Sequence, residues 1–209
     1  MANMEALSEF LQKGKAKDVA RLTQEALDAG MKPQEILDNG LLAGMNIIGA
    51  KFKNNEVFVP EVLIAARAMN AGMEILKPLL ADTGATTKGT VILGTVKGDL
   101  HDIGKNLVGM MMKGKGLEVI DLGTDVPPQR FIDEVKANNG SVIALSALLT
   151  TTMKEMGNVV KAVQDANLQD KVKVMVGGAP VTDSFKDSIG ADGYAPDATS
   201  AADMALTFC

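Results

Sequence analysis

Apolar residues in the first part of the chain recur at the three- and four-residue spacing of helices. Four segments show this spacing: residues 4–12, 19–27, 36–48 and 59–80. Pro33 lies just before the third segment and Pro60 at the start of the fourth, and proline is well tolerated in the first turn of a helix. The pattern predicts a bundle of four helices.

The rhythm changes after a short polar stretch. Residues 83–89 offer little to bury, so we predict a domain boundary there, between a helical domain at 1–85 and a second domain at 89–209. Short apolar runs then alternate with longer helical patterns. The runs lie at 90–96, 118–122, 141–145, 172–176 and 193–195, and the helical patterns at 104–113, 129–137, 153–166, 182–188 and 198–207. This alternation predicts a flavodoxin-like, doubly wound α/β sheet of five parallel strands.

Composition and charge narrow the function. Hydrophobic residues make up 46% of the chain and charged residues 22%, which is typical of a globular protein. With a net charge of −5 and 3% aromatic residues, we expect no binding to nucleic acid. Cys209 is the single cysteine, residues 1–7 do not resemble a secretory signal, and no run approaches the roughly 20 apolar residues of a membrane span. We therefore expect a cytoplasmic protein that does not bind a membrane.

Polar and glycine-rich residues follow the predicted strands. They lie at 97–104, 146–152, 177–180 and 195–198, after the first, third, fourth and fifth strands. The carboxyl ends of parallel strands meet at one edge of the sheet, and ligands of open sheets bind beyond that edge. We therefore expect one binding site there.

His101, the only histidine of the chain, lies in the first of these loops. Asp99 and Asp102 flank it, and a carboxylate on one imidazole nitrogen fixes the tautomer that presents the other nitrogen to a metal. Gly98 and Gly104 would let the backbone approach a large ligand closely. Taken alone, however, the pattern is that of an exposed loop histidine without a ligand.

Other kinds of site fit this loop less well. A phosphate-binding loop has four residues before its Gly-Lys pair, whereas five residues separate Gly98 from Gly104-Lys105, and Asn106 replaces the required Ser or Thr. A zinc site needs several nitrogen or sulfur ligands, which one histidine and a terminal cysteine cannot supply. A magnesium site made of carboxylates stays open. One protein nitrogen suffices only where the cofactor supplies the other ligands, as a tetrapyrrole-like ring does.

Three motifs resemble those of cobalamin-binding domains and occur in the same order. Asp99-x-His101-x-x-Gly104 is similar to their D-x-H-x-x-G signature, Ser146-x-Leu148 to their second element and Gly177-Gly178 to their third. With the helical segment in front, nearly the whole chain resembles the free-standing corrinoid proteins of methylamine, methanol and betaine methyltransferase systems. It is also similar to the cobalamin module of methionine synthase.

The resemblance implies a cobalamin bound base-off and His-on. The dimethylbenzimidazole tail leaves cobalt and inserts into the sheet, and His101 becomes the metal ligand. Asp99 hydrogen-bonds His101, and Thr152 stands where the methionine synthase module completes this relay with serine. The implied cofactor-binding residues of the second domain are Gly98, Asp99, His101, Asp102, Ile103, Gly104, Ser146, Leu148, Thr150, Thr152, Gly177, Gly178 and Ala198.

The resemblance also implies that the helical domain caps the upper, methyl-bearing face of the corrin. Phe52, Val59 and Val62 match the apolar contacts of the family's cap element. Periodicity alone favours a different interpretation for these three residues, as ordinary core of the helical bundle.

The implied function is that of a methyl carrier, itself non-catalytic. A substrate-specific methyltransferase places a methyl group on cob(I)alamin, and the chain presents methylcob(III)alamin to a second methyltransferase that serves a thiol cofactor or tetrahydrofolate. A reductive activation protein is a further implied partner. Three alternatives stay open: a B12-dependent sensor, the small cobalamin subunit of a mutase, and a flavodoxin-like binding module without a corrin.

Overall fold

The computed structural model describes residues 3–82 and 87–209. Two compact units divide the chain: a helical unit of residues 1–86 with 114–116, and an α/β unit of residues 87–113 with 117–209. The predicted boundary at 83–89 lies partly outside the described residues, because 83–86 are not among them.

The helical unit follows the apolar spacing of the sequence. Its elements are α1 (Met4–Gln12), α2 (Ala16–Asp28), α3 (Pro33–Ile36), η1 (Leu37–Leu42), α4 (Ala43–Lys53) and α5 (Val59–Asp82). Leu7, Leu11, Ile36 and Leu76 are fully buried in it. Pro33 and Pro60 both lie in the first turn of a helix, as their positions predict.

The helix predicted at 36–48 differs in one respect, because its middle is a π-helical turn. Residues Leu37–Leu42 form this turn between α3 and α4. Gly40 lies within it, and a Cβ atom at that position would collide with Cδ2 of Leu7. The wider turn therefore accompanies a close approach of α1, which apolar spacing within one segment does not reveal.

The α/β unit contains the five-stranded parallel sheet that the alternating pattern predicts. Its strands are β1 (Thr90–Thr95), β2 (Glu118–Asp121), β3 (Val142–Ser146), β4 (Lys173–Gly177) and β5 (Gly193–Tyr194). Their order, β2-β1-β3-β4-β5, is that of a flavodoxin-like sheet. All neighbouring pairs are parallel.

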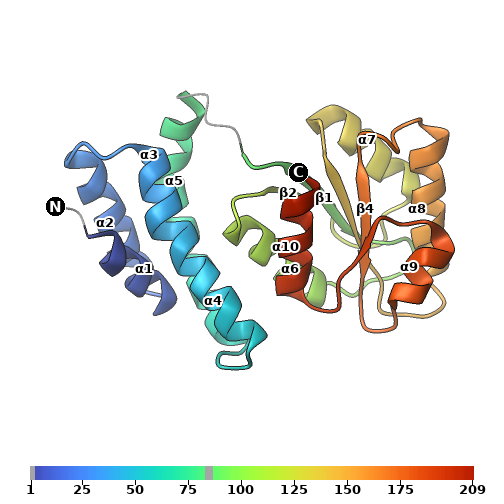
Figure 1. The fold of residues 1–209 in the computed structure, drawn as a ribbon, viewed down its shortest axis with the longest axis horizontal. Coiled ribbons are helices and arrows are strands. Elements are labelled where there is room, and N and C mark those ends of the chain that lie inside the picture. Colours follow the sequence, from blue (N-terminus) through green and yellow to red (C-terminus); the bar gives the residue numbers. More distant parts are fainter. Residues whose placement is uncertain (1–2, 83–86) are drawn as a thin grey trace. The chain divides into compact units, whose positions relative to one another are not determined.

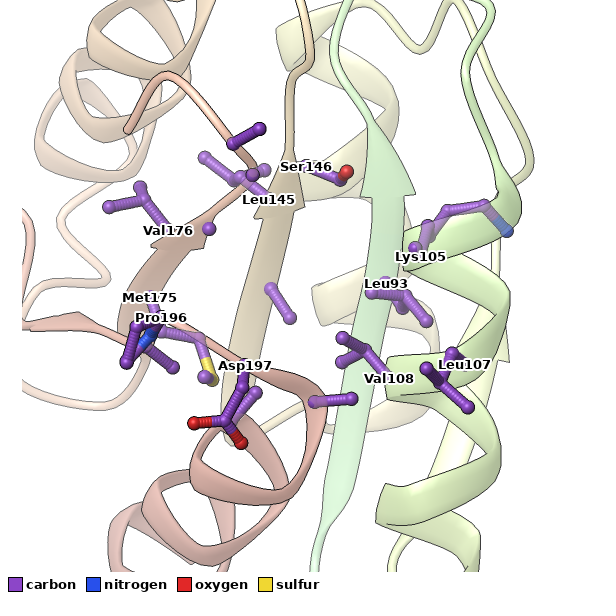
Figure 2. Close-up of a pocket in the computed structure, with 18 residues that line it drawn as sticks. Leu93, Lys105, Leu107, Val108, Leu145, Ser146, Met175, Val176, Pro196 and Asp197 are labelled. Carbon is purple, nitrogen blue, oxygen red and sulfur yellow. The ribbon is translucent and has the colours of Figure 1, made fainter. Parts of the chain in front are cut away.

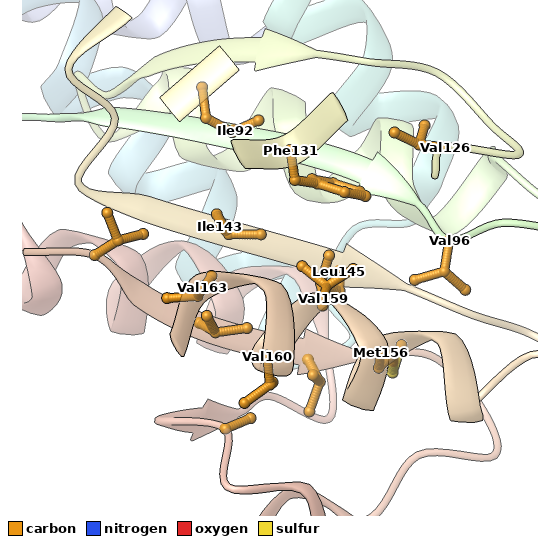
Figure 3. Packing of buried hydrophobic residues seen from close by; sticks show 14 of the residues in the cluster. Ile92, Val96, Val126, Phe131, Ile143, Leu145, Met156, Val159, Val160 and Val163 are labelled. Atoms are coloured by element: carbon orange, nitrogen blue, oxygen red, sulfur yellow. The ribbon is translucent and has the colours of Figure 1, made fainter. Parts of the chain in front are cut away.

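Helices cover both faces of this sheet (Figure 1). They are α6 (Ile103–Gly114), α7 (Pro128–Asn138), α8 (Lys154–Asp165), α9 (Asp183–Ile189) and α10 (Ala198–Phe208). Helices α7 and α8 pack on one face, where Phe131, Val159 and Val163 meet Ile92 and Ile143 of the sheet (Figure 3). Helices α6 and α10 lie over the other face, towards which the alternate strand residues point (Figure 1).

Phe131 is the largest fully buried side chain of the α/β core. A Cβ atom at Gly94 would lie 2.8 Å from its Cζ atom, so strand β1 approaches the ring closely. We expect Phe131→Ala to lower the free energy of unfolding by about 3–5 kcal/mol, because the cavity it leaves cannot collapse fully. Urea unfolding followed by circular dichroism measures this. Phe58→Ala is the matched control, since Phe58 is 63% exposed, and a comparable loss there would contradict the argument.

Candidate functional site

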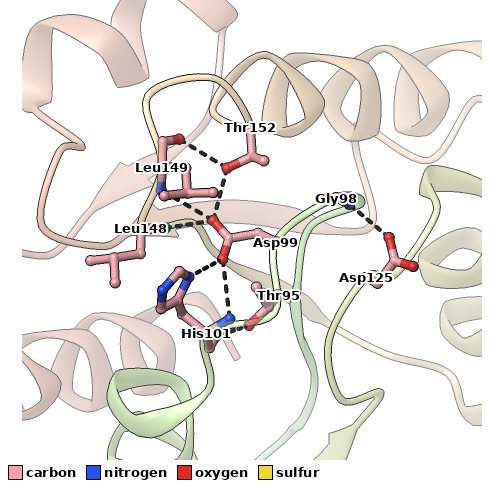
Figure 4. A network of polar contacts seen from close by, with 8 residues as sticks. All are labelled: Thr95, Gly98, Asp99, His101, Asp125, Leu148, Leu149 and Thr152. Atoms are coloured by element: carbon pink, nitrogen blue, oxygen red, sulfur yellow. Dashed lines mark hydrogen bonds and ion pairs between the residues drawn. The ribbon is translucent and has the colours of Figure 1, made fainter.

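The site is built around Asp99, whose side chain is fully buried in the loop between β1 and α6. Its Oδ1 atom accepts hydrogen bonds from Nδ1 of His101 at 2.7 Å and from the His101 backbone N–H at 3.1 Å. Its Oδ2 atom accepts from the backbone N–H groups of Leu148 at 2.8 Å and Leu149 at 3.1 Å, and from the Thr152 hydroxyl at 2.8 Å. Figure 4 shows this network. A buried carboxylate is thereby satisfied on both oxygens.

These contacts decide the charge of Asp99. Burial by itself raises the pKa of the carboxyl, but the hydrogen bonds from His101, Leu148 and Thr152 stabilise the carboxylate more strongly. The net effect holds the pKa of Asp99 well below its ordinary value of 3.8. Asp99 is therefore an anion at neutral pH and can only accept hydrogen bonds.

An ionised Asp99 fixes the orientation and tautomer of His101. Because the carboxylate is an acceptor, Nδ1 of the neutral imidazole carries the proton and Nε2 keeps its lone pair. The His101 side chain is 50% exposed, so Nε2 is open to a ligand. The pairing of a carboxylate with the second nitrogen is the arrangement found behind metal-binding histidines.

Thr152 occupies the far side of the carboxylate. Its hydroxyl is 2.8 Å from Oδ2 of Asp99 and also 2.8 Å from the carbonyl oxygen of Leu149. Both partners are acceptors, so the single hydroxyl proton serves one at a time. Thr152 thus lies in the position that the resemblance assigns to the third member of the relay.

Large apolar side chains beside His101 in the chain, and in the loop that binds Asp99, are not buried. Leu100 is 72% exposed and Ile103 81%, while Leu148 and Leu149 are 43% and 41% exposed. Leu100 precedes His101 in its loop and Ile103 begins α6, while Leu148 and Leu149 donate their backbone N–H groups to Asp99. Several large apolar side chains left exposed on neighbouring segments are typical of a surface that binds an apolar ligand.

A cavity of about 300 Å³ opens at the same edge of the sheet. Leu93, Ala144 and Met175 are paired across β1, β3 and β4 and form its floor on the sheet. Figure 2 shows Val108 of α6 beside Leu93. Its lining is largely apolar. The other lining residues are Gly104, Lys105, Leu107, Leu145, Ser146, Val176, Gly177, Gly178, Ala179, Ala195, Pro196, Asp197, Ala198 and Ala201.

Glycine is required beside this cavity at position 178. Gly178 has φ +129°, and a Cβ atom there would collide with the carbonyl oxygen of Ala147. The backbones that follow β3 and β4 therefore approach each other more closely than any side chain permits.

The structure brings several predicted residues together and leaves others apart. Gly104, Ser146, Gly177, Gly178 and Ala198 line the cavity. Asp99, His101 and Thr152 form the hydrogen-bonded group. Leu148 and Thr150 are exposed and do not contribute to the cavity wall; the contribution of Leu148 is its backbone N–H.

Three further predicted residues have local contacts in the loop before α6. Gly98 has φ +80° and donates its N–H to Oδ1 of Asp125. Asp102 accepts a hydrogen bond from the Asn106 side chain, and Ile103 begins α6 with its side chain exposed. In the helical unit Val62 is fully buried, Val59 is 36% exposed and Phe52 is half-buried, so their role towards a ligand stays a prediction.

Some residues of the site were missed from sequence. Leu93 and Met175 belong to strands, and their alternation with buried neighbours indicates which side chains share a face but not which face holds a cavity. Lys105 is almost fully buried, where its stem lines the cavity and its ammonium group pairs with Asp121. Asp125 has no local signal at all, since its partner is 27 residues away.

Comparison with known families agrees with this geometry. The B12 binding domain family matches residues 89–203, and a second B12 binding domain family matches residues 4–77. The chain belongs to the B12-binding family.

Relatives of this B12-binding chain resemble it over most of its length. The dimethylamine corrinoid protein of Methanosarcina barkeri is 45% identical over 88% of this chain and 87% of its own length. The methanol:cobalamin methyltransferase complex MtaBC of Methanosarcina barkeri has a TM-score of 0.86 and 31% identity, covering 96% of this chain and 77% of that chain. A cobalamin-binding protein from Desulfitobacterium hafniense has a TM-score of 0.80 and 28% identity, and both chains are covered completely.

Two negative findings concern the described residues only. Among residues 3–82 and 87–209, three or more His, Cys, Asp or Glu side chains nowhere gather as they would around a metal ion. Within the same ranges, every helix falls short of the length and apolar character that crossing a membrane requires.

The pH dependence of stability tests the buried carboxylate. The folded-state pKa of Asp99 lies below its unfolded value, so its ionisation stabilises the fold above about pH 4 and this contribution is lost as the pH falls further. We expect Asp99→Asn to lower the free energy of unfolding by about 3 kcal/mol at pH 7. Urea unfolding at pH 7, 5, 4 and 3 should show the difference narrowing only below about pH 4. A difference that stays constant down to pH 3 would contradict the depressed pKa.

Proposed function

We infer that this chain is a corrinoid protein that carries methyl groups for a methyltransferase system. The relatives named dimethylamine corrinoid protein and methanol:cobalamin methyltransferase complex support this function. One structural observation carries the inference: the free Nε2 of His101, fixed by a buried Asp99, lies at the sheet edge that also holds a largely apolar cavity.

The residues of the α/β unit fit a base-off, His-on cobalamin. A corrin ring supplies four nitrogen ligands of its own, so the single imidazole of His101 would suffice as the protein's ligand to cobalt. Leu100, Ile103 and Leu148 offer exposed apolar surface to the ring. The cavity accepts a flat apolar tail beside Ser146 and Gly178.

Bound cobalamin supplies the cobalt that carries the methyl group. The contribution of the chain is to control the lower ligand. A ligating histidine must be neutral, and the ionised Asp99 holds the proton on Nδ1 so that Nε2 can bind. Thr152 supports the carboxylate from its other side, which makes the arrangement a three-member relay.

The helical unit and the partner enzymes complete the proposal. Phe52, Val59 and Val62 are proposed to face the upper side of the corrin. The MtaBC complex supports a substrate-specific methyltransferase as partner. We further propose a second methyltransferase, which serves a thiol cofactor or tetrahydrofolate, and a reductive activation protein. The match of a second B12 binding domain family to the helical residues 4–77 favours a carrier over the small subunit of a mutase, a class that lacks the helical cap.

Hydroxocobalamin binding tests the function directly. We expect the corrin absorbance to elute with the protein on gel filtration. In the reduced cob(II) form, the electron paramagnetic resonance spectrum should show coupling to one protein nitrogen, which His101→Ala removes. A corrin that does not co-elute would refute the function. Nitrogen coupling that persists in His101→Ala would refute His101 as the ligand.

Filling the cavity tests where the corrinoid tail lies. Ala201 is buried and lines the cavity, so Ala201→Leu should occupy space that the tail needs. We expect the dissociation constant for hydroxocobalamin to rise about tenfold or more, the equivalent of one or two lost apolar contacts. Binding of cobinamide, which lacks the tail, should change little. Ala137→Leu on the exposed side of α7 is the matched control. Equal weakening of both corrinoids would place the tail elsewhere.

A further inference from the structure

Asp125, in the loop between β2 and α7, is hydrogen-bonded to the loop between β1 and α6 that carries His101. Its Oδ1 atom accepts the N–H of Gly98 at 2.6 Å (Figure 4). Its own backbone N–H donates to the carbonyl oxygen of Asp99 at 3.0 Å. Asp125 therefore contacts the backbone on either side of the Gly98–Asp99 peptide, two residues before His101.

The loop that carries Asp125 is itself fixed to strand β1. The N–H of Thr95 donates to the carbonyl oxygen of Gly123 at 2.9 Å, and the N–H of Val126 donates to that of Thr95 at 3.0 Å. Thr95 is fully buried, and its hydroxyl donates to the carbonyl oxygen of His101 at 2.8 Å. The residues on both sides of Asp125 are thus hydrogen-bonded to strand β1, which keeps Asp125 in place.

The backbone of Asp125 is in the left-handed region, with φ +55°. Among the described residues, the other non-glycine positions with positive φ are Asn55, Asn139 and Asn167. Each of these three asparagines lies at the end of a helix, where a left-handed residue is common. Asp125 ends no helix and is exposed, so neither capping nor packing accounts for its conformation. Its contacts with Gly98 and Asp99 do.

We propose that Asp125 is a positioning residue for the cobalt ligand. Asp99 is held on its carboxylate by the loop that follows β3, and on its backbone by Asp125. Because both the side chain and the backbone of Asp99 are fixed, its carboxylate holds the His101 ring in a single orientation. This role rests on the proposed function, because it concerns the presentation of Nε2 to a corrinoid.

Three variants separate the hydrogen bond from the backbone conformation. Asp125→Gly keeps the left-handed backbone and removes the acceptor. Asp125→Asn keeps both the conformation and an acceptor oxygen, so it should restore the contact with Gly98. Asn167→Gly makes the same kind of change at a left-handed position after α8 and is the matched control.

Amide hydrogen exchange of the chain without corrinoid gives the first measurement. The His101 N–H donates to Oδ1 of Asp99, so its protection reports the geometry of the pair. We expect Asp125→Gly to speed its exchange about tenfold, as the loss of one hydrogen bond to a charged group implies. Asp125→Asn and Asn167→Gly should stay within about twofold of the unaltered chain.

Hydroxocobalamin gives the second measurement. In Asp125→Gly we expect an about tenfold rise in its dissociation constant and a weakened nitrogen coupling in the cob(II) spectrum, both restored in Asp125→Asn. Unchanged exchange and coupling in Asp125→Gly would overturn the proposal, and so would equal losses in Asn167→Gly. Failure of the proposed function is recognised separately, because the unaltered chain would then bind no corrinoid.

Discussion

The arrangement of this site depends on one carboxylate, that of Asp99, which is buried away from water. Burying the charge of Asp99 is costly unless both oxygens are fully hydrogen-bonded. Five donors meet this requirement, two from His101 and three from the loop after β3. They bring together residues that lie about fifty positions apart in the chain, as the separation of Leu148 from Asp99 shows. The two loops therefore have one mutual arrangement in which the charge is satisfied, and His101 takes its orientation from it.

The topology of the sheet explains why these two loops can meet. In the order β2-β1-β3-β4-β5, strands β1 and β3 are neighbours, yet the helices that follow them lie on opposite faces. Loops that diverge from adjacent strands leave a crevice between them, which is where open parallel sheets bind ligands. Asp99 joins the two loops across this crevice through its hydrogen bonds to the loop after β3. The cavity lies on the face of the same strands that α6 and α10 cover. The proposed sites for the corrin ring and for its tail thus both arise from one feature of the fold.

Local patterns predicted most of the fold and only part of the site. Alternating strands and helices were readable because each apolar run is short and bounded, and the motif around His101 located the loop that holds the proposed metal ligand. The π-helical turn at Leu37–Leu42 was not predictable, because it accompanies the packing of Gly40 against Leu7 from another helix. The cavity floor was missed for a related reason. Leu93 differs from Ile92 only in the face to which it points, and the helices on each face decide whether that side chain meets a core or a cavity.

The contrast between Asp99 and His101 follows from their separate tasks. The proposed role of His101 as a metal ligand requires an accessible nitrogen, and its side chain is half exposed. An exposed imidazole on a loop would rotate freely if nothing held it. Its orientation must then come from a neighbour that cannot move, and a fully buried, fully bonded carboxylate is such a neighbour. Each further donor to Asp99 restricts its carboxylate, and therefore also the rotation of the His101 imidazole that is bonded to it. Because Asp99 is buried and held rigidly, His101 can be exposed and still keep one orientation. This explains why the two residues lie two positions apart in the loop that follows a strand.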